Sequence, residues 1–298
     1  MGRLLRMQSH PAPAKINLFL AITGRRPDAF HNLVSVAAPL TWGDLIEAEP
    51  VAGPSTVSCD QPGVPTDGSN LVLKAAAAFA VATGWQQGVH FTIRKKIPFG
   101  AGLGGASTDA VAALRAMNGL SGGLLDREGL LQAAAAVGSD CPLFLAPGPV
   151  IMRGRGERIE PLPREAYGRI RGMRVLVFKP GFAVPTPWAY GRLAAEGPKS
   201  YVTLAGAEAR LSAWLERAGE PIDSLLYNTM ERPVFAKFPA VPLLLEQIRG
   251  RFGLAPRMSG SGSACFALLH EDVDAGPVEA QIRESWGPSA FVVETRLA

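Results

Sequence analysis

The sequence reads Pro98-Phe99-Gly100-Ala101-Gly102-Leu103-Gly104-Gly105-Ala106-Ser107-Thr108-Asp109-Ala110 across its most informative segment. Because glycine has no side chain, this density of glycine lets the backbone turn tightly and direct successive N–H groups toward one point. Apolar residues follow at helical spacing. The segment therefore predicts a loop that leads into a helix, with Ser107 as the N-cap and Asn118-Gly119 at its end.

The loop and the helix start together predict an anion-binding site. Backbone N–H groups at a helix N-terminus attract negative charge, and the hydroxyls of Ser107 and Thr108 can bind phosphate or Mg²⁺. A plain connection between a strand and a helix is the alternative. Four glycines and two hydroxyl residues within nine positions exceed what such a turn needs, so we favour phosphate binding.

A dinucleotide-binding motif is a second way to interpret the same glycines. Gly100, Gly102 and Gly105 match the pattern G-x-G-x-x-G, which is a weak signal by itself. A dinucleotide fold also places an acidic residue about 20 positions further on, at the end of a second strand. The nearest candidates, Asp126 and Glu128, open a predicted helix. The sequence therefore disfavours an NAD-binding enzyme, and it contains no Gly-Lys-Ser/Thr of a P-loop.

The composition is that of a globular protein. Of the 298 residues, 47% are hydrophobic and 19% are charged, which excludes a collagen, a coiled coil and a disordered chain. The net charge of +4 is too small and too scattered for a dedicated nucleic-acid binder. Three widely spaced cysteines and the lack of a long uncharged apolar segment predict a cytoplasmic protein with no membrane partner.

Strands and helices alternate along the chain without a regular βαβ rhythm, which predicts an α+β fold. The Pro- and Arg-rich stretch Glu160–Arg171 marks a boundary between domains at 1–165 and 166–298. The expected strands are Ile16–Ile22, Leu33–Leu40, Leu45–Glu49, His90–Ile97, Met173–Lys179, Ser263–Leu269 and Ala290–Leu297, and the expected helices are Asn70–Thr83, Asp126–Val137, Leu204–Ala218 and Val241–Phe252.

Four further positions each allow two interpretations. Asp140 is expected in a loop, because the following proline disfavours helical geometry at Cys141, and it either caps that turn or does chemistry. The segment Met258–Ser263 is either a flexible turn or a second loop that approaches a ligand closely. Lys15 is either an edge-strand charge or a cation in a site. His31 is either a structural group or a functional one.

Taken together, these segments resemble the GHMP kinases, the family of galactokinase, homoserine kinase and mevalonate kinase. Pro98–Ala110 looks like the second motif of that family, and Ser259–Ser263 looks like the third. Further motifs in the same order extend the resemblance over nearly the whole chain: Pro13–Leu20, Phe30-His31, Ser69–Leu71, Gly138–Pro142, Gly154–Glu157, Pro185–Pro187 and Asn228–Glu231.

The resemblance implies a fold and an activity. The fold would be a two-domain GHMP kinase fold, with a ribosomal S5-like N-terminal domain and a ferredoxin-like C-terminal domain. The activity would use ATP and Mg²⁺ to phosphorylate a hydroxyl on the methylerythritol part of a cytidine-diphosphate conjugate, a step of non-mevalonate isoprenoid precursor biosynthesis. The partner would be this small molecule, with no nucleic acid and no membrane.

The resemblance also implies roles for individual residues. Asp140 aligns with the catalytic aspartate, which would accept the hydroxyl proton, and Lys15 with the lysine that would keep this carboxylate ionised. The residues implied for the substrate are Asn17, Phe30, His31, Thr186 and Tyr190, and those implied for the nucleotide are Asn70, Lys95 and the loop Pro98, Gly100, Ala101, Gly102, Leu103, Gly104, Gly105, Ala106, Ser107 and Thr108, with Ser107 also a metal ligand.

The chain departs from the family pattern at three places. It has Ala29-Phe30-His31 where Gly-Tyr-His is usual, Ala106–Asp109 where Gly-Ser-Ser-Asn is usual, and Ser139 where Ala is usual. Asp109 would repel ATP phosphates unless it faces away, caps the helix or meets Mg²⁺. A kinase for another small alcohol, and a ligand sensor of the same fold without turnover, are the alternative functions.

Overall fold

The computed structural model describes residues 7–298, which form two compact units. The first unit comprises the chain up to Ala14, Trp42–Phe99 and Gly104–Pro147, and the second comprises Lys15–Thr41, Gly100–Leu103 and Gly148–Ala298. Two long strands, β1 (Gln8–Arg25) and β2 (His31–Val51), each contribute residues to both units. The domain boundary near residue 165 stays a prediction.

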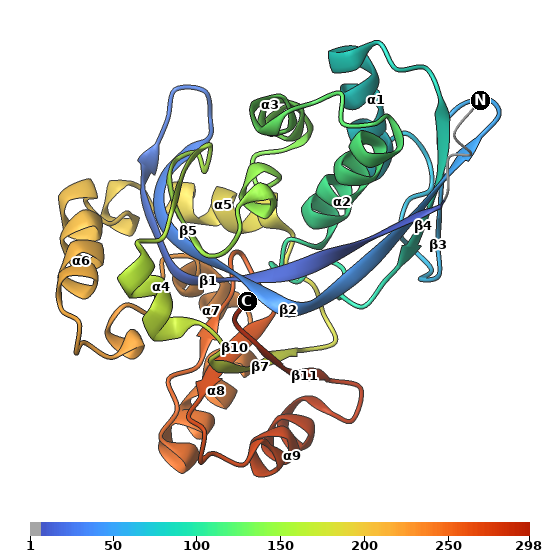
Figure 1. Ribbon diagram of the computed structural model, residues 1–298. Helices are drawn as coiled ribbons and strands as arrows, with labels where there is room; N and C mark the ends of the chain where they lie inside the picture. Colours follow the sequence, from blue (N-terminus) through green and yellow to red (C-terminus); the bar gives the residue numbers. More distant parts are fainter. Residues whose placement is uncertain (1–6) are drawn as a thin grey trace. The chain divides into compact units, whose positions relative to one another are not determined.

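Within the described residues, the first unit contains three helices and the β3-β4-β2 part of a seven-stranded sheet. The Leu45–Val51 part of β2 pairs antiparallel with β4, which pairs in parallel with β3. Helices α1, α2 and α3 pack against one another in the green part of the chain (Figure 1). The bounds are β3 Thr56–Cys59, α1 Leu71–Thr83, β4 Gly88–Arg94, α2 Gly105–Leu120, α3 Arg127–Val137 and the 3-10 helix η1 Pro142–Leu145.

Local sequence signals explain where two of these helices begin and end. The side chain of Asn70 accepts a hydrogen bond from Val72 N at the start of α1, and that of Asp126 accepts one from Gly129 N at the start of α3. Gly84 ends α1 in the left-handed conformation, at φ +71°. Both predicted helices are confirmed to within a residue at their starts.

The second unit contains two sheets. In one, β5 pairs antiparallel with the Leu33–Ala37 part of β2 and with β6, and β8 pairs in parallel with β1. In the other, the order is β11-β7-β10-β9 and all neighbours are antiparallel. The strand bounds are β5 Val150–Gly154, β6 Arg158–Pro161, β7 Arg174–Lys179, β8 Tyr227–Asn228, β9 Arg257–Met258, β10 Cys265–Leu269 and β11 Phe291–Arg296.

Helices in the second unit supply much of its core. Their bounds are α4 Arg164–Ile170, α5 Thr186–Ala195, α6 Leu204–Glu216, α7 Glu231–Lys237, α8 Ala240–Phe252 and α9 Ala275–Trp286, with 3-10 helices η2 Pro198–Ser200 and η3 Ile222–Ser224. One buried cluster joins Phe178 of β7 and Ala267 of β10 to Leu244 of α8 and Ile282 of α9. The helix predicted at Val241–Phe252 packs in this core through Val241, Leu244, Leu245 and Ile248, because burial removes these apolar side chains from water.

The α+β prediction is confirmed, and three details of the sequence analysis are wrong. Leu33–Leu40 and Leu45–Glu49 belong to the single strand β2, whose Gly43 leaves no room for a Cβ beside the backbone of Ala12 and Pro13. Helix α2 runs to Leu120, beyond the predicted end at Asn118-Gly119. Cys141 has helical backbone angles despite the proline after it. Among residues 7–298, no helix has the length and apolar character that crossing a membrane requires.

The turn between β1 and β2 contains a strained alanine. Ala29 has φ +66°, a region that disfavours every residue with a Cβ, and it is one of the positions where the family pattern has glycine. The turn is closed by hydrogen bonds from Arg26 N to Phe30 O (2.8 Å) and from Ala29 N to Arg26 O (3.2 Å). The hydrogen bonds of the turn therefore impose this conformation, which alanine does not prefer by itself.

We expect Ala29→Gly to raise the free energy of unfolding by up to about 1 kcal/mol. The left-handed conformation costs an L-residue roughly 1–2 kcal/mol, and the greater freedom of glycine in the unfolded chain offsets part of that gain. Urea unfolding measures the change. Glycine at the exposed Ala135 within α3 is the control and should lower the stability by about 1 kcal/mol. If both substitutions destabilise equally, Ala29 is not strained.

Candidate functional site

The predicted phosphate loop is divided between the two units. Its first part, Gly100–Leu103, belongs to the second unit and packs against the segment Met258–Ser263. Ala264 N donates to Ala101 O (3.1 Å), and Ser259 Oγ donates to Gly102 O (3.1 Å). Gly102 has φ +74°, and a Cβ there would collide with the carbonyl oxygen of Ser259. Backbone angle and packing both require glycine at this position.

Lys15 lies buried beside Gly102. Its side chain is 4% exposed, and Nζ donates to Gly102 O (2.9 Å) and to Asn17 Oδ1 (2.5 Å). Asn17 in turn donates through Nδ2 to Ser35 Oγ (2.9 Å). Lys15 and Asn17 share one face of β1 because side chains two residues apart in a strand point the same way. The burial of Lys15 rules out the edge-strand interpretation, and its catalytic role stays a prediction.

The second part of the loop, Gly104–Thr108, starts helix α2 in the first unit. The N-cap is Gly104 at φ +76°, and no side chain caps the helix, so the prediction of Ser107 as N-cap is wrong. Ser107 lies in the first turn, because the helix starts at Gly105, directly after the left-handed Gly104. The first N–H groups of a helix have no partner within it. An uncapped N-terminus on a helix of 16 residues suits a phosphate group.

Ser107 connects the start of α2 to the segment that contains Asp140. Helix α2 packs against η1, and the Ser107 hydroxyl lies close enough to the thiol of Cys141, the residue after Asp140, to lower its pKa. Burial raises the pKa of that thiol to about 11, which keeps it protonated at neutral pH. Asp140 itself is half-buried in the turn before η1. Within the first unit, the predicted catalytic carboxylate therefore belongs to the segment that contacts the predicted phosphate site.

A buried ion cluster lies behind the helix start. Lys95 Nζ pairs with Asp44 Oδ2 (2.5 Å) and with Asp109 Oδ2 (2.6 Å), and both carboxylates are nearly inaccessible. Asp44 Oδ1 also accepts the backbone N–H groups of Lys96 and Ile97. The Asp109 carboxylate thus pairs with Lys95 inside the protein. Of the arrangements considered for this departure from the family pattern, the structure shows the one in which Asp109 faces protein partners. Asp44 was missed by the sequence analysis, because its partner Lys95 lies 51 residues further along the chain.

The charges of this cluster are not balanced. Burial raises the pKa of Asp109 to about 7, against the lowering effect of Lys95, and its Oδ1 is buried without a hydrogen-bond partner among the described residues. Burial lowers the pKa of Lys95, but the two carboxylates more than offset this and raise it. At neutral pH the folded protein therefore exists with Asp109 in both its neutral and its ionised form.

Two of the predicted substrate residues, His31 and Tyr190, lie together in the second unit. His31 is 8% exposed, its ring centre lies 5.0 Å from that of Tyr190, and its Nε2 is 3.3 Å from the hydroxyl of Tyr201. Burial, followed by the charge of Arg25, lowers the pKa of His31. The ring is thus neutral at pH 7, with one donor and one acceptor nitrogen. Tyr201, which precedes α6, carried no sequence signal.

Phe30 and Thr186, two further predicted substrate residues, have separate contacts. Phe30 is 51% exposed, and the guanidinium of Arg155 lies 4.7 Å from its ring centre. Thr186 Oγ1 is within 2.7 Å of Ser261 Oγ, so this residue touches the segment that also contacts Gly102. The structure therefore brings together His31 with Tyr190 and Thr186 with Ser261, while Phe30 contacts Arg155.

The side chain of Asn70 makes two hydrogen bonds within the fold. Its Oδ1 caps α1, and its Nδ2 donates to Pro65 O (2.6 Å). A nucleotide contact by Asn70, and metal binding by Ser107, stay predictions. In the part of the chain that the structure describes, no group of three or more His, Cys, Asp or Glu side chains could hold a metal ion.

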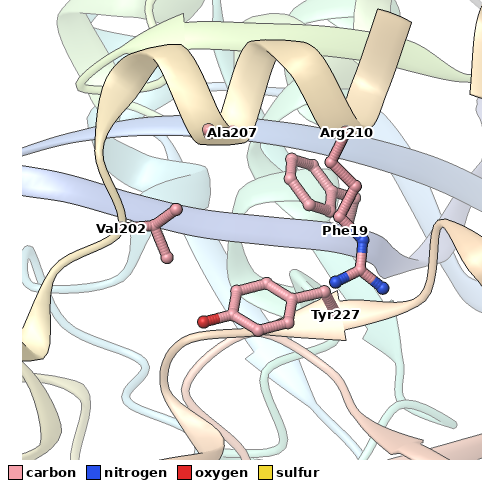
Figure 2. Close-up of a pocket in the computed structure, with 6 residues that line it drawn as sticks. Phe19, Val202, Ala207, Arg210 and Tyr227 are labelled. Carbon is pink, nitrogen blue, oxygen red and sulfur yellow. The ribbon is translucent and has the colours of Figure 1, made fainter. Parts of the chain in front are cut away.

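One cavity of the second unit, of about 230 Å³, lies beneath α6 (Figure 2). The residues that line it are Phe19, Val202, Gly206, Ala207, Arg210 and Tyr227. The guanidinium of Arg210 lies over the ring of Tyr227, at 5.1 Å from its centre, and donates to the carbonyl oxygens of Ser224 and Leu226. No predicted site residue lines this cavity. Its one charged lining group, the Arg210 guanidinium, hydrogen-bonds backbone carbonyl oxygens.

The geometry fits one class of protein, and sequence comparisons establish it. The "GHMP kinases N terminal domain" family matches residues 70–148, and the "GHMP kinases C terminal" family matches residues 210–288. The chain belongs to the GHMP kinase family and is an ATP-dependent small-molecule kinase. The two predicted motifs, the uncapped helix N-terminus and the segment 259–263, are thus those of a phosphoryl-transfer enzyme.

Two relatives that match most of the chain carry the same name. The 4-diphosphocytidyl-2-C-methyl-D-erythritol kinase of Gloeobacter violaceus is 37% identical over 290 residues, which is 96% of this chain and 94% of that protein. The enzyme of the same name from Methylacidiphilum infernorum is 38% identical, over 88% of this chain and 86% of that protein. A crystal structure of 4-(cytidine 5'-diphospho)-2C-methyl-D-erythritol kinase matches with a TM-score of 0.76 at 34% identity, over 98% of this chain and 100% of that one.

A more distant structure shares the fold alone. Homoserine kinase from Cytophaga hutchinsonii matches with a TM-score of 0.76 at 18% identity, over 100% of this chain and 96% of that one. The two-domain GHMP kinase fold expected from the sequence is confirmed.

The Asp44–Lys95–Asp109 cluster predicts a pH-dependent stability. Because the folded protein raises the pKa of Asp109 from its ordinary 3.8 to about 7, the stability from this group is complete below pH 4 and is lost as the pH rises through 7. Asp109→Asn keeps an acceptor for Lys95 but cannot ionise. We expect the free energy of unfolding of the wild type, measured with urea, to decline between pH 5 and 8. The decline should amount to a few kcal/mol, at about 1.4 kcal/mol per pKa unit. It should be smaller in the variant.

A matched control separates burial from the mere loss of a charge. Asp126→Asn removes a carboxylate at an exposed helix cap, where asparagine caps equally well. Its stability curve should stay parallel to that of the wild type. Parallel curves for Asp109→Asn as well would contradict a raised pKa at Asp109.

Proposed function

We propose that this kinase transfers the γ-phosphoryl group of ATP to a hydroxyl on the methylerythritol part of 4-diphosphocytidyl-2-C-methyl-D-erythritol, in the cytoplasm, as a step of isoprenoid precursor biosynthesis. The relatives that match nearly the whole chain at 37–38% identity carry the name of that reaction. A kinase for another small alcohol and a sensor without turnover are not favoured by these comparisons.

The observation that carries the choice of substrate is the buried His31 beside two tyrosine rings. A pyrimidine base is flat and has hydrogen-bonding groups on its edge, so aromatic rings and a neutral imidazole are suited to it. A kinase for a bare sugar alcohol has no need of such a set. Phe30, with half its surface exposed, offers a further face for stacking.

The reaction assigns Asp140 and Lys15 complementary tasks. Phosphoryl transfer needs an aligned hydroxyl, a group that accepts its proton, and positive charge near the transferred group. Asp140 would accept the proton, and Lys15 would favour the ionised carboxylate and the developing alkoxide. The amides at the start of α2 and the loop before them would hold the ATP phosphates, with hydroxyls of Ser107 and Thr108 beside them. Mg²⁺, when bound, neutralises charge on the β- and γ-phosphates.

ADP release tests the reaction and the base together. With ATP and Mg²⁺, we expect release that depends on the cytidine-diphosphate conjugate and falls by about 10²–10⁴-fold in Asp140→Asn, the range typical for loss of a general base. The variant keeps the shape of the side chain, so circular dichroism should show the wild-type fold. Full activity in Asp140→Asn would remove it from the mechanism. Stoichiometric ligand binding without ADP release in the wild type would favour the sensor.

The substrate pocket makes a separate prediction. We expect His31→Ala to raise the KM for the conjugate about tenfold with a smaller change in kcat. One or two hydrogen bonds to the base are then lost equally from the bound ground state and from the transition state. Tyr201→Phe, which removes only the hydroxyl near His31 Nε2, should give a smaller rise in the same direction. An unchanged KM in His31→Ala would argue that the enzyme acts on an alcohol without a pyrimidine.

A further inference from the structure

The segment Asn228-Thr229-Met230-Glu231 has no role in the proposed mechanism, yet its first residue is tightly held. Asn228 ends β8, where parallel pairing places it opposite Leu20 of β1, and it is 4% exposed. Its Nδ2 donates to Met258 O (2.7 Å) and to Gly260 O (2.8 Å), and its Oδ1 accepts from Met230 N (2.9 Å). Both amide protons and the acceptor oxygen are used, so the orientation of this side chain is fixed.

Glu231, the first residue of α7, contacts the same segment from another direction. Its Oε1 accepts a hydrogen bond from Met258 N (2.9 Å), and its Oε2 lies 3.9 Å from Arg257 Nη1. Burial raises the pKa of Glu231, against the lowering effects of the Met258 N–H and Arg257. Asn228 and Glu231 together satisfy three backbone groups that surround Ser259: Met258 N–H, Met258 C=O and Gly260 C=O.

Ser259 is the residue whose position these bonds determine. It is fully buried, and its Oγ accepts from Asn17 N (3.3 Å) and donates to Gly102 O (3.1 Å). The next residue packs just as closely, because a Cβ on Gly260 would lie 3.4 Å from Lys15 Nζ and 3.4 Å from Asn17 Oδ1. The segment 258–260 therefore forms the surface against which Lys15 and the first half of the phosphate loop are packed.

We propose that Asn228 and Glu231 are positioning residues for phosphoryl transfer. They hold Ser259 and Gly260 in place, and these residues hold Gly102 and Lys15 in the arrangement that the reaction uses. The inference rests on the proposed function, because it assigns the pair a part in that reaction. A displacement of about 1 Å in a site built for transfer can cost about 100-fold in rate, so the pair acts on kcat without touching substrate.

Kinetics of four variants test this role. Asn228→Asp is isosteric but has no protons for the two carbonyl groups, and Glu231→Ala removes the acceptor for Met258 N. We expect each to lower kcat about 10- to 100-fold, with the KM for the conjugate changed less than threefold. Glu231→Gln retains an acceptor oxygen and should restore kcat to within about threefold of the wild type. Thr229→Ala, which loses only a buried hydrogen bond to Ile22 N, should retain the wild-type kcat.

Hydrogen exchange gives a readout that does not depend on the substrate. The amides of Ser259 and Gly262 are bonded to Ala264 O and Ser259 O within the segment. We expect faster exchange in peptides covering 258–264 and 100–103 in Asn228→Asp and Glu231→Ala, and wild-type exchange in Glu231→Gln and Thr229→Ala. If the wild type does not turn over the conjugate, the proposed function fails. This exchange pattern still tests whether Asn228 and Glu231 hold the segment 258–260 in place.

Several outcomes would overturn the proposal. One is wild-type kcat in folded Asn228→Asp and Glu231→Ala. Another is an equal loss of kcat in Thr229→Ala, which would indicate general destabilisation. A third is failure of Glu231→Gln to restore the activity lost in Glu231→Ala. If Asn228→Asp does not fold, the comparison of these two Glu231 variants alone tests the proposal.

Discussion

The carbonyl oxygen of Gly102 is the point on which the candidate site of the second unit depends. It accepts one hydrogen bond from Lys15 Nζ and another from Ser259 Oγ. Strand β1, the phosphate loop and the segment 258–263 are distant in sequence, and this oxygen joins all three. The arrangement is possible because residue 102 has no Cβ, which would otherwise collide with the Ser259 carbonyl. A requirement of the backbone thereby fixes where a buried cation lies.

Two buried lysines show how the fold accommodates charge in different ways. Lys95 is paired with two carboxylates, and the raised pKa of Asp109 follows from burying more negative than positive charge. Lys15 has neutral oxygens among its acceptors, those of Asn17 and Gly102. Neutral acceptors satisfy the protons of an ammonium group without cancelling its charge. The charge of Lys95 is offset within the protein by the carboxylates of Asp44 and Asp109.

The sequence predicted what depends on neighbours along the chain and missed what depends on distant ones. Helices α1 and α3 were predicted to within a residue at their starts, because Asn70 and Asp126 cap them locally. The residue types of the loop Pro98–Thr108 and of Lys15 predict a phosphate site and a cation in it, and both roles stay predictions. The continuity of β2 through Gly43 was missed, since its cause is the nearby backbone of Ala12. Asp44 and Tyr201 were missed for the same reason, because each acts through partners far away in sequence.

The phosphate loop is one motif in sequence but two packing problems in three dimensions. Gly102 packs against backbone atoms of the segment 258–263, which cannot move aside without breaking the bonds to Asn228 and Glu231. Gly105 instead faces the Lys95 ammonium and an Ile97 methyl group, each 3.1 Å from where a Cβ would lie. Side-chain ends can shift by a few tenths of an ångström, whereas a bonded backbone cannot. Conformational freedom alone therefore does not explain Gly102 and Gly105, because a different neighbour leaves little room for a Cβ at each position.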